Sequence, residues 1–166
     1  TWDEYFKIGK DSKAKGFPIG QSFGQSFGDP PTFAYPLLWS FGGAEIDAAG
    51  KVAINSKETI EAMKFMAAGW KDSFDEGGLA WDDSGNNRAF LAGQVSLTAN
   101  GVSLYYAATK DPAMEELAAD IRTTNLPIGP VGESIELHQT TSLSIFNHTQ
   151  YPEAAMAYLQ FMYDAQ

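Results

Sequence analysis

Apolar positions along the chain recur with helical spacing in several stretches that short β-like runs separate. The first helix is expected at residues 2–15, because Thr1 and Glu4 have the spacing of a capping box and Gly16 provides a stop. Its mixed apolar face contains Trp2, Tyr5, Phe6 and Ile8. A cap, an apolar face and a terminal glycine together predict a helix at this end of the chain.

The clearest helix is expected after Asn55 and Ser56, which with Glu58 form an N-terminal capping signal. Apolar residues then recur three and four positions apart in one stripe, which contains Ile60, Met63, Ala67, Trp70 and Phe74. Such a stripe is typical of a helix that packs on a core, so we expect these side chains to be buried.

Further helices and strands alternate through the rest of the chain. Pro30 and Pro31 are expected to form a turn before a helix in which Pro36 stands early, and Asp83 or Ser84 to cap a later helix. The other helices are expected at 33–41, 84–92, 102–108, 111–119 and from Pro152, with Ala155, Leu159 and Met162 on its buried side. Strands are expected at 17–19, 51–55, 95–98, 121–126 and 140–146. This alternation predicts an α/β fold.

A connector of proline and glycine, PIGPVG at residues 127–132, divides this pattern in two. The part after it contains one strand and one helix, which cannot bury a core alone. The chain also begins without methionine and stops directly after an apolar helical pattern. We therefore expect two lobes, the second incomplete, in a piece of a longer protein.

Composition excludes several classes of function. The net charge is −10 and no run of Lys or Arg occurs, which argues against nucleic acid and anionic membrane surfaces as partners. No apolar stretch of about 18 residues is present, so we expect no membrane insertion. The absence of cysteine excludes disulfides, zinc–thiolate sites and cysteine nucleophiles, and it is compatible with an oxidising compartment.

Motifs for cofactors and metals are missing. The sequence has no G-x-S-x-G, no P-loop and no G-x-G-x-x-G, so we expect neither a serine nucleophile nor a nucleotide cofactor. His138 and His148 lack the spacing of metal ligands. Tyr105 and Tyr106 could hold ferric iron, but packing of one ring and exposure of the other explains them better. We expect no metal.

One pair of carboxylates leaves a catalytic alternative open. Asp82 and Asp83 could serve glycoside hydrolysis, with Glu133 or Glu136 as a partner from elsewhere in the chain. Adjacent residues at a helix start diverge, however, and acidic residues there are stabilised by the helix dipole. A structural role is the better explanation.

Three separated segments share one chemistry, which is an amide, hydroxyl or carboxylate beside an aromatic ring. They are the loop of residues 20–32 with the helix that follows, the stretch at 81–87, and the stretch at 100–106. Sugar hydroxyls bind amides and carboxylates, and the C–H faces of sugars pack on aromatic planes. Because loops at the ends of strands converge in open α/β folds, we expect these segments to line one sugar-binding crevice.

An ordered set of motifs resembles a known family. The motifs are TWDE at 1–4, PLLWSFGG at 36–43, DxxGKVAINSKETIEA at 47–62, WDDSGNNRAFLAGQVSLTANG at 81–101 and LPIGP at 126–130. They are collinear over essentially the whole chain with the extracellular solute-binding proteins of bacterial ABC importers, most closely with the carbohydrate-binding branch that includes maltose-binding protein.

The resemblance implies the bilobal type II fold of periplasmic binding proteins, with a ligand cleft between two hinged lobes. Residues 1–126 would form most of the C-terminal lobe, 127–139 the hinge or crossing segment, and 140–166 one strand and one helix of the N-terminal lobe. The first part of that lobe and the end of the protein would lie outside this sequence, which would account for the incomplete second lobe.

The resemblance also suggests which residues bind the ligand. The segment before Tyr35 is similar to one that supplies a stacking aromatic and a carboxylate, and the turn at Asn100 is similar to one that precedes a stacking tryptophan. In both places this sequence departs from the family's aromatic residue, with Ser103 at the second. The expected ligand-binding residues are Asp29, Thr32, Phe33, Trp81, Asp82, Asp83, Asn100, Gly101, Ser103 and Tyr105.

The expected function is that of a substrate-binding component, not an enzyme, that captures a sugar or oligosaccharide and delivers it to the membrane permease of an ABC transporter. The resemblance implies a periplasmic or extracellular location, and we expect a monomer. Two alternatives stay open. One is a glycoside hydrolase, and the other is a receptor for a cationic ligand such as a polyamine, which the net charge of −10 would favour.

Overall fold

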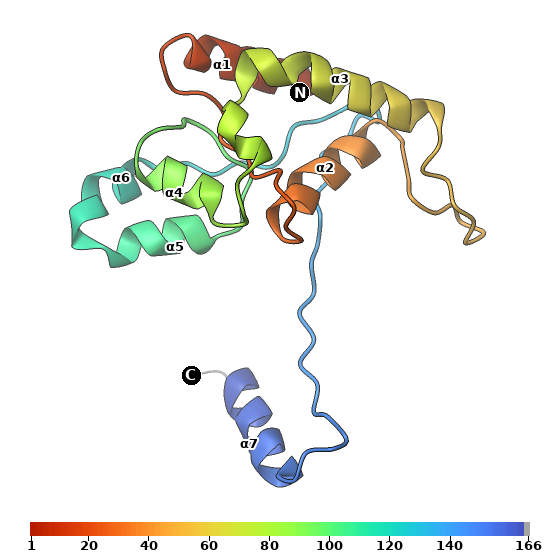
Figure 1. Ribbon diagram of the computed structural model, residues 1–166, viewed down its shortest axis with the longest axis vertical. Coiled ribbons are helices and arrows are strands. Elements are labelled where there is room, and N and C mark those ends of the chain that lie inside the picture. The colour runs from red at the N-terminus through yellow and green to blue at the C-terminus, as the bar shows by residue number, and fades with distance from the viewer. Residues whose placement is uncertain (165–166) are drawn as a thin grey trace.

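A computed structural model of the chain describes residues 1–164. Its helices and 3-10 turns, shown in Figure 1, are α1 (Trp2–Lys13), α2 (Asp29–Ser40), α3 (Lys57–Ser73), η1 (Glu76–Leu79), α4 (Gly85–Leu91), α5 (Ser103–Lys110), η2 (Pro112–Met114), α6 (Glu115–Asp120) and α7 (Pro152–Tyr163). Helices α1 to α6 gather in one body, and α7 lies apart from it at the end of an extended segment (Figure 1). Within the described residues, none of these helices has the length and apolar character of a membrane span.

Helix α1 begins as the sequence predicts. The Thr1 hydroxyl accepts a hydrogen bond from the Glu4 amide at 3.3 Å, and the Glu4 carboxylate accepts one from the N-terminal ammonium at 2.8 Å. Gly16, three residues after the helix, has φ of +91°, a conformation that glycine adopts without strain. The capping box and the glycine stop are therefore confirmed.

Helix α2 begins four residues earlier than the sequence suggested. Pro30 and Pro31 do not form a turn before it; they lie in its first turn, where their missing N–H groups cost nothing. Pro36, expected near the start of a shorter helix, lies inside α2 instead. Asp29 and Thr32 lie in the first turn of α2, so neither belongs to the predicted loop of residues 20–32.

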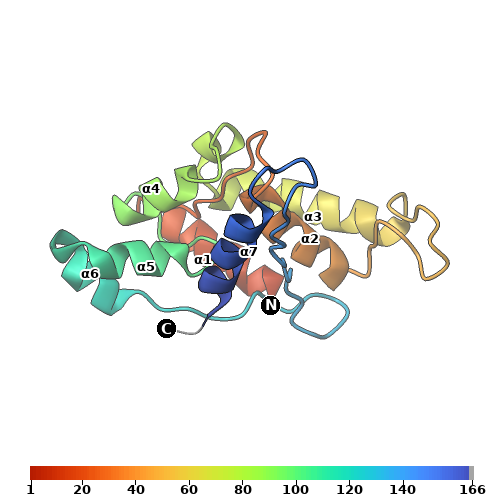
Figure 2. The same ribbon diagram turned by 90° about the horizontal axis from the view of Figure 1, so that it is seen from below.

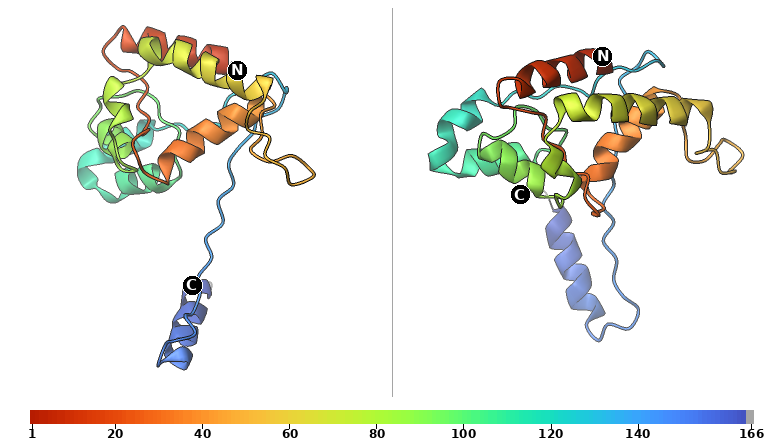
Figure 3. Two further views of the ribbon diagram at one scale, coloured as in Figure 1. Left: turned by 45° about the vertical axis from the view of Figure 1, so that its right-hand side comes forward. Right: turned by 45° about the horizontal axis from the view of Figure 1, so that its top comes forward.

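Helix α3 is capped as predicted, because the Ser56 hydroxyl accepts a hydrogen bond from the Thr59 amide at 3.1 Å. The predicted stripe is buried only at its end, where Phe74 lies in the core and Trp70 packs against it. Ile60 and Met63 are 47% and 41% exposed, and the fully buried position in the helix interior is Ala62. Helices α1 and α3 pack closely side by side (Figures 1 and 3), with Phe65 and Gly69 of α3 against Phe6 of α1. A Cβ atom at Gly69 would lie only 1.9 Å from the Phe6 ring.

The predicted strands are reduced to single bridges in residues 1–164. Ile19 pairs in parallel with Phe74 and with Leu97, through backbone bonds such as Gly20 N to Leu97 O at 2.8 Å. A further bridge, between Ile46 and Val52, falls in the predicted strand 51–55. Residues 121–126 and 140–146 form no ladder among the described residues, and the helix predicted at 111–119 is divided into η2 and α6. A strand needs neighbouring strands to pair with, and residues 121–126 and 140–146 have no such partner among residues 1–164.

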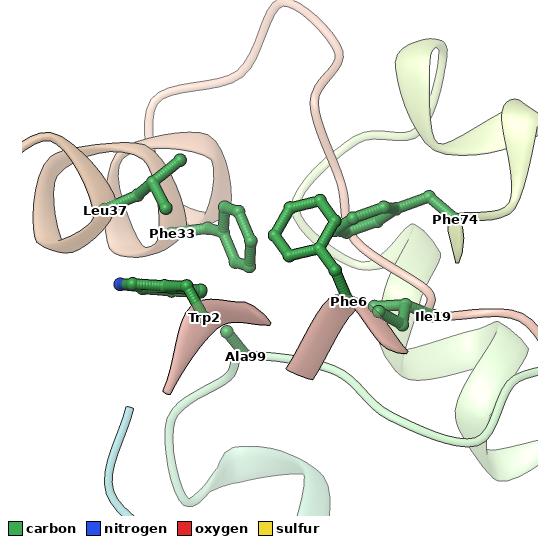
Figure 4. Packing of buried hydrophobic residues seen from close by; sticks show 7 residues of the cluster. All are labelled: Trp2, Phe6, Ile19, Phe33, Leu37, Phe74 and Ala99. Carbon is green, nitrogen blue, oxygen red and sulfur yellow. The ribbon is translucent and has the colours of Figure 1, made fainter. Parts of the chain in front are cut away.

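The core is aromatic and joins α1, α2 and the end of α3 (Figure 4). Phe33 and Phe74 are both 0% exposed, and their rings meet edge to face at 5.7 Å. The cluster contains Trp2, Phe6, Ile19, Phe33, Leu37, Phe74 and Ala99. Burial of Phe33 one turn into α2 fixes the N-terminus of that helix relative to α1 and α3.

The proline-glycine connector of residues 127–132 is hydrogen-bonded to α1 and α2. Trp2 N donates to Ile128 O at 3.2 Å, and Val131 N donates to Ser40 O at 3.0 Å. The Trp2 indole also donates to the Ser40 hydroxyl at 2.8 Å, and a Cβ at Gly129 would lie 2.5 Å from that hydroxyl. Residues 128–131 are therefore held on α1 and α2.

Residues 137–149 run away from the body, and α7 follows them as a separate helix (Figures 1 and 3). Seen from below, α7 is drawn in front of the body (Figure 2). Pro152 is the first residue of α7, as predicted. Its predicted buried side is not buried within the described chain, because Ala155 and Leu159 are half-buried and Met162 is 52% exposed. The side chains of 143–149 and α7 border an open hollow of about 460 Å³.

Candidate ligand-binding site

The loop of residues 20–28 crosses the body beside η1 and the turn that follows it. Phe23 N donates to Gly78 O at 2.7 Å, and Gly24 N donates to Trp81 O at 3.1 Å. A Cβ at Gly24 would lie 2.3 Å from that Trp81 carbonyl, so only glycine fits this approach. The first and second predicted segments, at 20–32 and 81–87, therefore lie against each other.

Asp83 joins these two segments directly. Its carboxylate accepts hydrogen bonds from the Ser26 hydroxyl at 2.6 Å, from Gly28 N at 3.1 Å and from Asp29 N at 2.8 Å. These bonds, of which that from Ser26 is the strongest influence, lower the pKa of Asp83 below its ordinary value. Asp83 thus caps α2 from a distant part of the chain. The expectation that it caps the helix at 84–92 is wrong, and Ser84 holds the N-cap position of α4 without a capping hydrogen bond.

Asp29 carries an unused acceptor at the start of α2. Its Oδ2 is buried and has no hydrogen-bond partner among residues 1–164. Burial is the main cause that raises the pKa of Asp29 above its ordinary value of 3.8, and the charge of Asp83 acts in the same direction. The nearby Asn86 side chain opposes this shift, although it makes no hydrogen bond of good geometry to Oδ2. A buried acceptor without a partner carries a free-energy cost that a donated hydrogen bond would remove.

Two buried amides, which are not among the expected ligand-binding residues, join the first two segments to Thr98 and Ala99, just before the third. Asn86 is 0% exposed; its Oδ1 accepts from the Ser22 hydroxyl at 3.2 Å and its Nδ2 donates to the Thr98 hydroxyl at 3.1 Å. Gln21 is also 0% exposed, and its Oε1 accepts from Ala99 N at 3.1 Å. Both amides stand among the polar residues of the predicted segments, so the sequence contained them but gave no sign that they are buried.

The third predicted segment meets α4 at the turn that contains Asn100. The Asn100 side chain donates to Asn87 Oδ1 and accepts a hydrogen bond from Gly101 N at 2.7 Å. Gly101 itself is exposed. Together with the Asp83 and Asn86 contacts, this bond connects parts of 20–32 and 81–87 to residues 98–101, of which only Asn100 and Gly101 belong to the predicted segment 100–106.

The remaining predicted residues occupy different environments. The Thr32 hydroxyl donates to Asp29 O within the first turn at 2.7 Å, and Phe33 is 0% exposed, which leaves it no surface for a ligand. Ser103 is exposed at the first position of α5, and Tyr105 is 43% exposed on the same helix. Trp81 is half-buried and borders a hollow of about 250 Å³ with Arg88.

The two adjacent carboxylates of Asp82 and Asp83 have different hydrogen-bond partners. Asp82 accepts hydrogen bonds from the Ser84 amide at 3.1 Å and from the Arg88 guanidinium at 3.1 Å, and the Ser84 bonds are the main cause of its lowered pKa. Asp83 is occupied with the start of α2. Both carboxylates therefore hold the local backbone, Asp82 at the start of α4 and Asp83 at the start of α2, which is the structural role that the sequence favours.

Comparisons with known proteins agree with this architecture. The family described as "Bacterial extracellular solute-binding protein" matches residues 1–166. Among solved structures, maltose-bound MalE3 of T. maritima has a TM-score of 0.70 and 25% identity, and the match covers 81% of this chain and 34% of that one. The comparison with curated proteins gave no match.

A second solved structure shows the same fold at lower identity. It is an ABC transporter solute-binding protein from Agrobacterium radiobacter K84 in complex with ribitol, with a TM-score of 0.72, 17% identity, and coverage of 98% of this chain and 41% of that one. The chain thus spans 34% and 41% of the lengths of these two proteins. The predicted type II fold of periplasmic binding proteins is confirmed, here as a helix-rich part with few strands. The chain belongs to the family of bacterial extracellular solute-binding proteins.

Proposed function

We propose that this chain is part of the substrate-binding component of an ABC importer, which captures a sugar or oligosaccharide and delivers it to a membrane permease. The family match supports the transport role. One similar structure holds maltose and another holds ribitol, and both ligands are neutral molecules rich in hydroxyl groups. A periplasmic or extracellular location, a monomeric state and the absence of catalysis belong to the same proposal.

The ligand would bind in a cleft between two lobes, with residues 1–126 in one lobe, 127–139 in the crossing and 140–166 in the other. The loop of residues 20–28 and helix α7 lie on the same side of the body, which supports a site that faces the second lobe (Figures 1 and 3). Because residues 128–131 are held by Trp2 and Ser40, bending between the lobes would occur after them, in the extended residues 137–141.

The observation that carries this proposal is the buried Oδ2 of Asp29, which has no partner among residues 1–164 and belongs to the turn where Asp83 joins the first two polar segments. An unpaired buried acceptor costs roughly 1–3 kcal/mol. A ligand hydroxyl that donates to Oδ2 would remove this cost only in the bound state. Binding would therefore favour the closed arrangement of the lobes, and the permease would respond to that arrangement.

Isothermal titration of the full-length protein with maltose, ribitol and spermidine tests this function. We expect binding of at least one of the two hydroxylated compounds, and recovery of that compound intact by chromatography. Asp29→Asn should weaken that binding at pH 7, because the amide presents a donor or a weaker acceptor in place of the carboxylate oxygen. Binding of spermidine alone would support the cationic-ligand alternative instead, and hydrolysis of maltose would support the enzyme.

A further inference from the structure

Asn100 is the one asparagine in the 166 residues that a glycine follows. A backbone amide attacks the side-chain amide of the preceding asparagine most easily when it belongs to glycine, which has no side chain to restrict the approach. The product of that attack is a cyclic imide, which water opens to aspartate or isoaspartate. The structure decides whether the two groups lie close enough to react.

The backbone nitrogen of Gly101 lies beside the group that it would attack. Gly101 N donates to Asn100 Oδ1 at 2.7 Å, which places the nitrogen next to Cγ, the carbon that carries this oxygen. Among residues 1–164, the Gly101 amide makes no other hydrogen bond. It is therefore not held in a helix or a strand ladder that would keep it from the side chain.

The turn is open to solvent, from which base and water arrive. Gly101 is exposed and Asn100 is half-buried. A Cβ atom at Gly101 would have no heavy atom within 4 Å, and φ of Gly101 lies outside the left-handed region. Base can therefore reach this turn, and alanine can replace Gly101 without a clash or backbone strain.

The neighbouring Asn87 provides an internal comparison. Its Oδ1 accepts a hydrogen bond from the Asn100 side chain, so the two asparagines share one contact. The amide that follows Asn87, Arg88 N, donates to Ser84 O at 3.0 Å inside α4. Side chains in a helix lean toward its N-terminus, away from the amide that follows them. The same reaction is therefore blocked at Asn87.

We propose that Asn100 is a site of spontaneous deamidation, which releases the 100–101 turn from α4 as the protein ages. Base removes the proton of the Gly101 amide, and the nitrogen forms a bond to Asn100 Cγ. The Cγ–Nδ2 bond breaks, and Nδ2 takes up a proton and leaves as ammonia. Water then opens the imide, so the net reaction consumes water, releases ammonia and leaves a carboxylate at position 100.

The modification removes the side-chain bond between this turn and α4. The Asn100 amide donates to Asn87 Oδ1, whereas a carboxylate has no proton to donate and its charge repels that oxygen. Isoaspartate also lengthens the backbone by a methylene group. The inference goes beyond the proposed function, because no ligand takes part in the reaction. Asn100 and Gly101 are both expected ligand-binding residues, so ageing would alter the candidate site itself.

Incubation of the full-length protein, followed by peptide mapping with mass spectrometry, tests this assignment. The peptide that contains Asn100 should gain about 1 Da and yield isoaspartate with release of ammonia, faster at pH 8 than at pH 6. The peptides with Asn87 and with Asn147, which is exposed but precedes histidine, should stay unchanged over the same period. Gly101→Ala should slow the reaction about tenfold, or about 1.4 kcal/mol in the activation barrier, because its methyl group restricts the approach of the nitrogen.

Hydrogen exchange measures the release of the turn. Aged protein should exchange the amides of residues 98–102 faster than fresh protein, whereas exchange in α1 should stay the same. Asn100→Asp should show the faster exchange when freshly prepared, because its carboxylate is the product of the reaction. Asn87→Ala is the matched variant, since it removes the same contact from the other side and should also speed exchange at 98–102.

Two results would overturn the proposal. If Asn100 reacts no faster than Asn147, or if Gly101→Ala reacts as fast as the unchanged protein, the turn does not promote the attack. If Asn100 deamidates but exchange at 98–102 stays as in fresh protein, the modification does not release the turn. Neither result depends on the binding of maltose or ribitol, so the failure of this inference and the failure of the proposed function are distinguishable.

Discussion

Replacement of Asn86 by alanine tests whether the buried amide network holds the candidate site together. Asn86 is 0% exposed, and its side chain links the loop of residues 20–28 to the stretch at 98–101. The substitution removes the acceptor of the Ser22 hydroxyl and the donor to the Thr98 hydroxyl. Both hydroxyls would lose a partner in a place that water reaches poorly.

The expected loss of stability follows from these two bonds. Ser22 is 0% exposed, so its unpaired hydroxyl costs about 1–3 kcal/mol, although it still accepts from Asn86 N at 3.2 Å. Thr98 is half-buried and can recover part of its bond from water, which limits its share to about 0.5–1.5 kcal/mol. We expect Asn86→Ala to lower the free energy of unfolding by about 1.5–4.5 kcal/mol, the sum of the two contributions.

Urea unfolding of the full-length protein, followed by tryptophan fluorescence, measures this change. Asn87→Ala is the matched control, because Asn87 lies next along α4, is half-buried and makes one side-chain bond, to Asn100. It should cost only about 0.5–1.5 kcal/mol. An Asn86 variant that is no less stable than the Asn87 variant would refute the assignment of Asn86 as the centre of a buried network.

Three further predictions follow from the packing and charges of the body. Asp29→Asn should stabilise the protein at pH 7 but not below pH 3.8, because burial raises the pKa of Asp29 above 3.8 and its ionised form opposes folding as the pH rises. Unfolding curves at both pH values measure this effect, and equal stability of the variant and the unchanged protein at pH 7 would contradict it. Gly69→Ala should cost about 1–3 kcal/mol in urea unfolding despite a better helix propensity, because its methyl group would meet the Phe6 ring; a gain in stability would show that the helices can separate without cost. Trp2→Phe removes the donor to the Ser40 hydroxyl and should increase amide hydrogen exchange in residues 128–131, whereas unchanged exchange would show that the connector is held by its backbone bonds alone.

The parts of the fold that the sequence predicts correctly are those that local rules decide. The capping box at Thr1 and the cap at Ser56 need only residues within one turn of each helix. The stop at Gly16 needs only a positive φ. The stripe of α3 was placed correctly at Trp70 and Phe74 but wrongly at Ile60 and Met63, because periodicity finds a helix but not the partner that it packs on. A small partner-facing side, here at Ala62 and Gly69, carries little hydrophobic signal.

In the candidate site, too, the sequence does not predict which distant residues contact one another. The sequence predicts that carboxylates, amides and aromatics gather in three segments, and the structure brings parts of those segments together. It cannot predict that Asp83 caps a helix whose first residue lies 54 positions earlier, because no local pattern distinguishes a carboxylate that binds a ligand from one that binds distant amides. The glycines of the 20–28 loop were the available signal. A Cβ atom at Gly24 would meet Trp81, and one at Gly28 would meet Asp83. These two glycines, four positions apart, are therefore needed because two chain segments approach closely, and not because the loop is flexible.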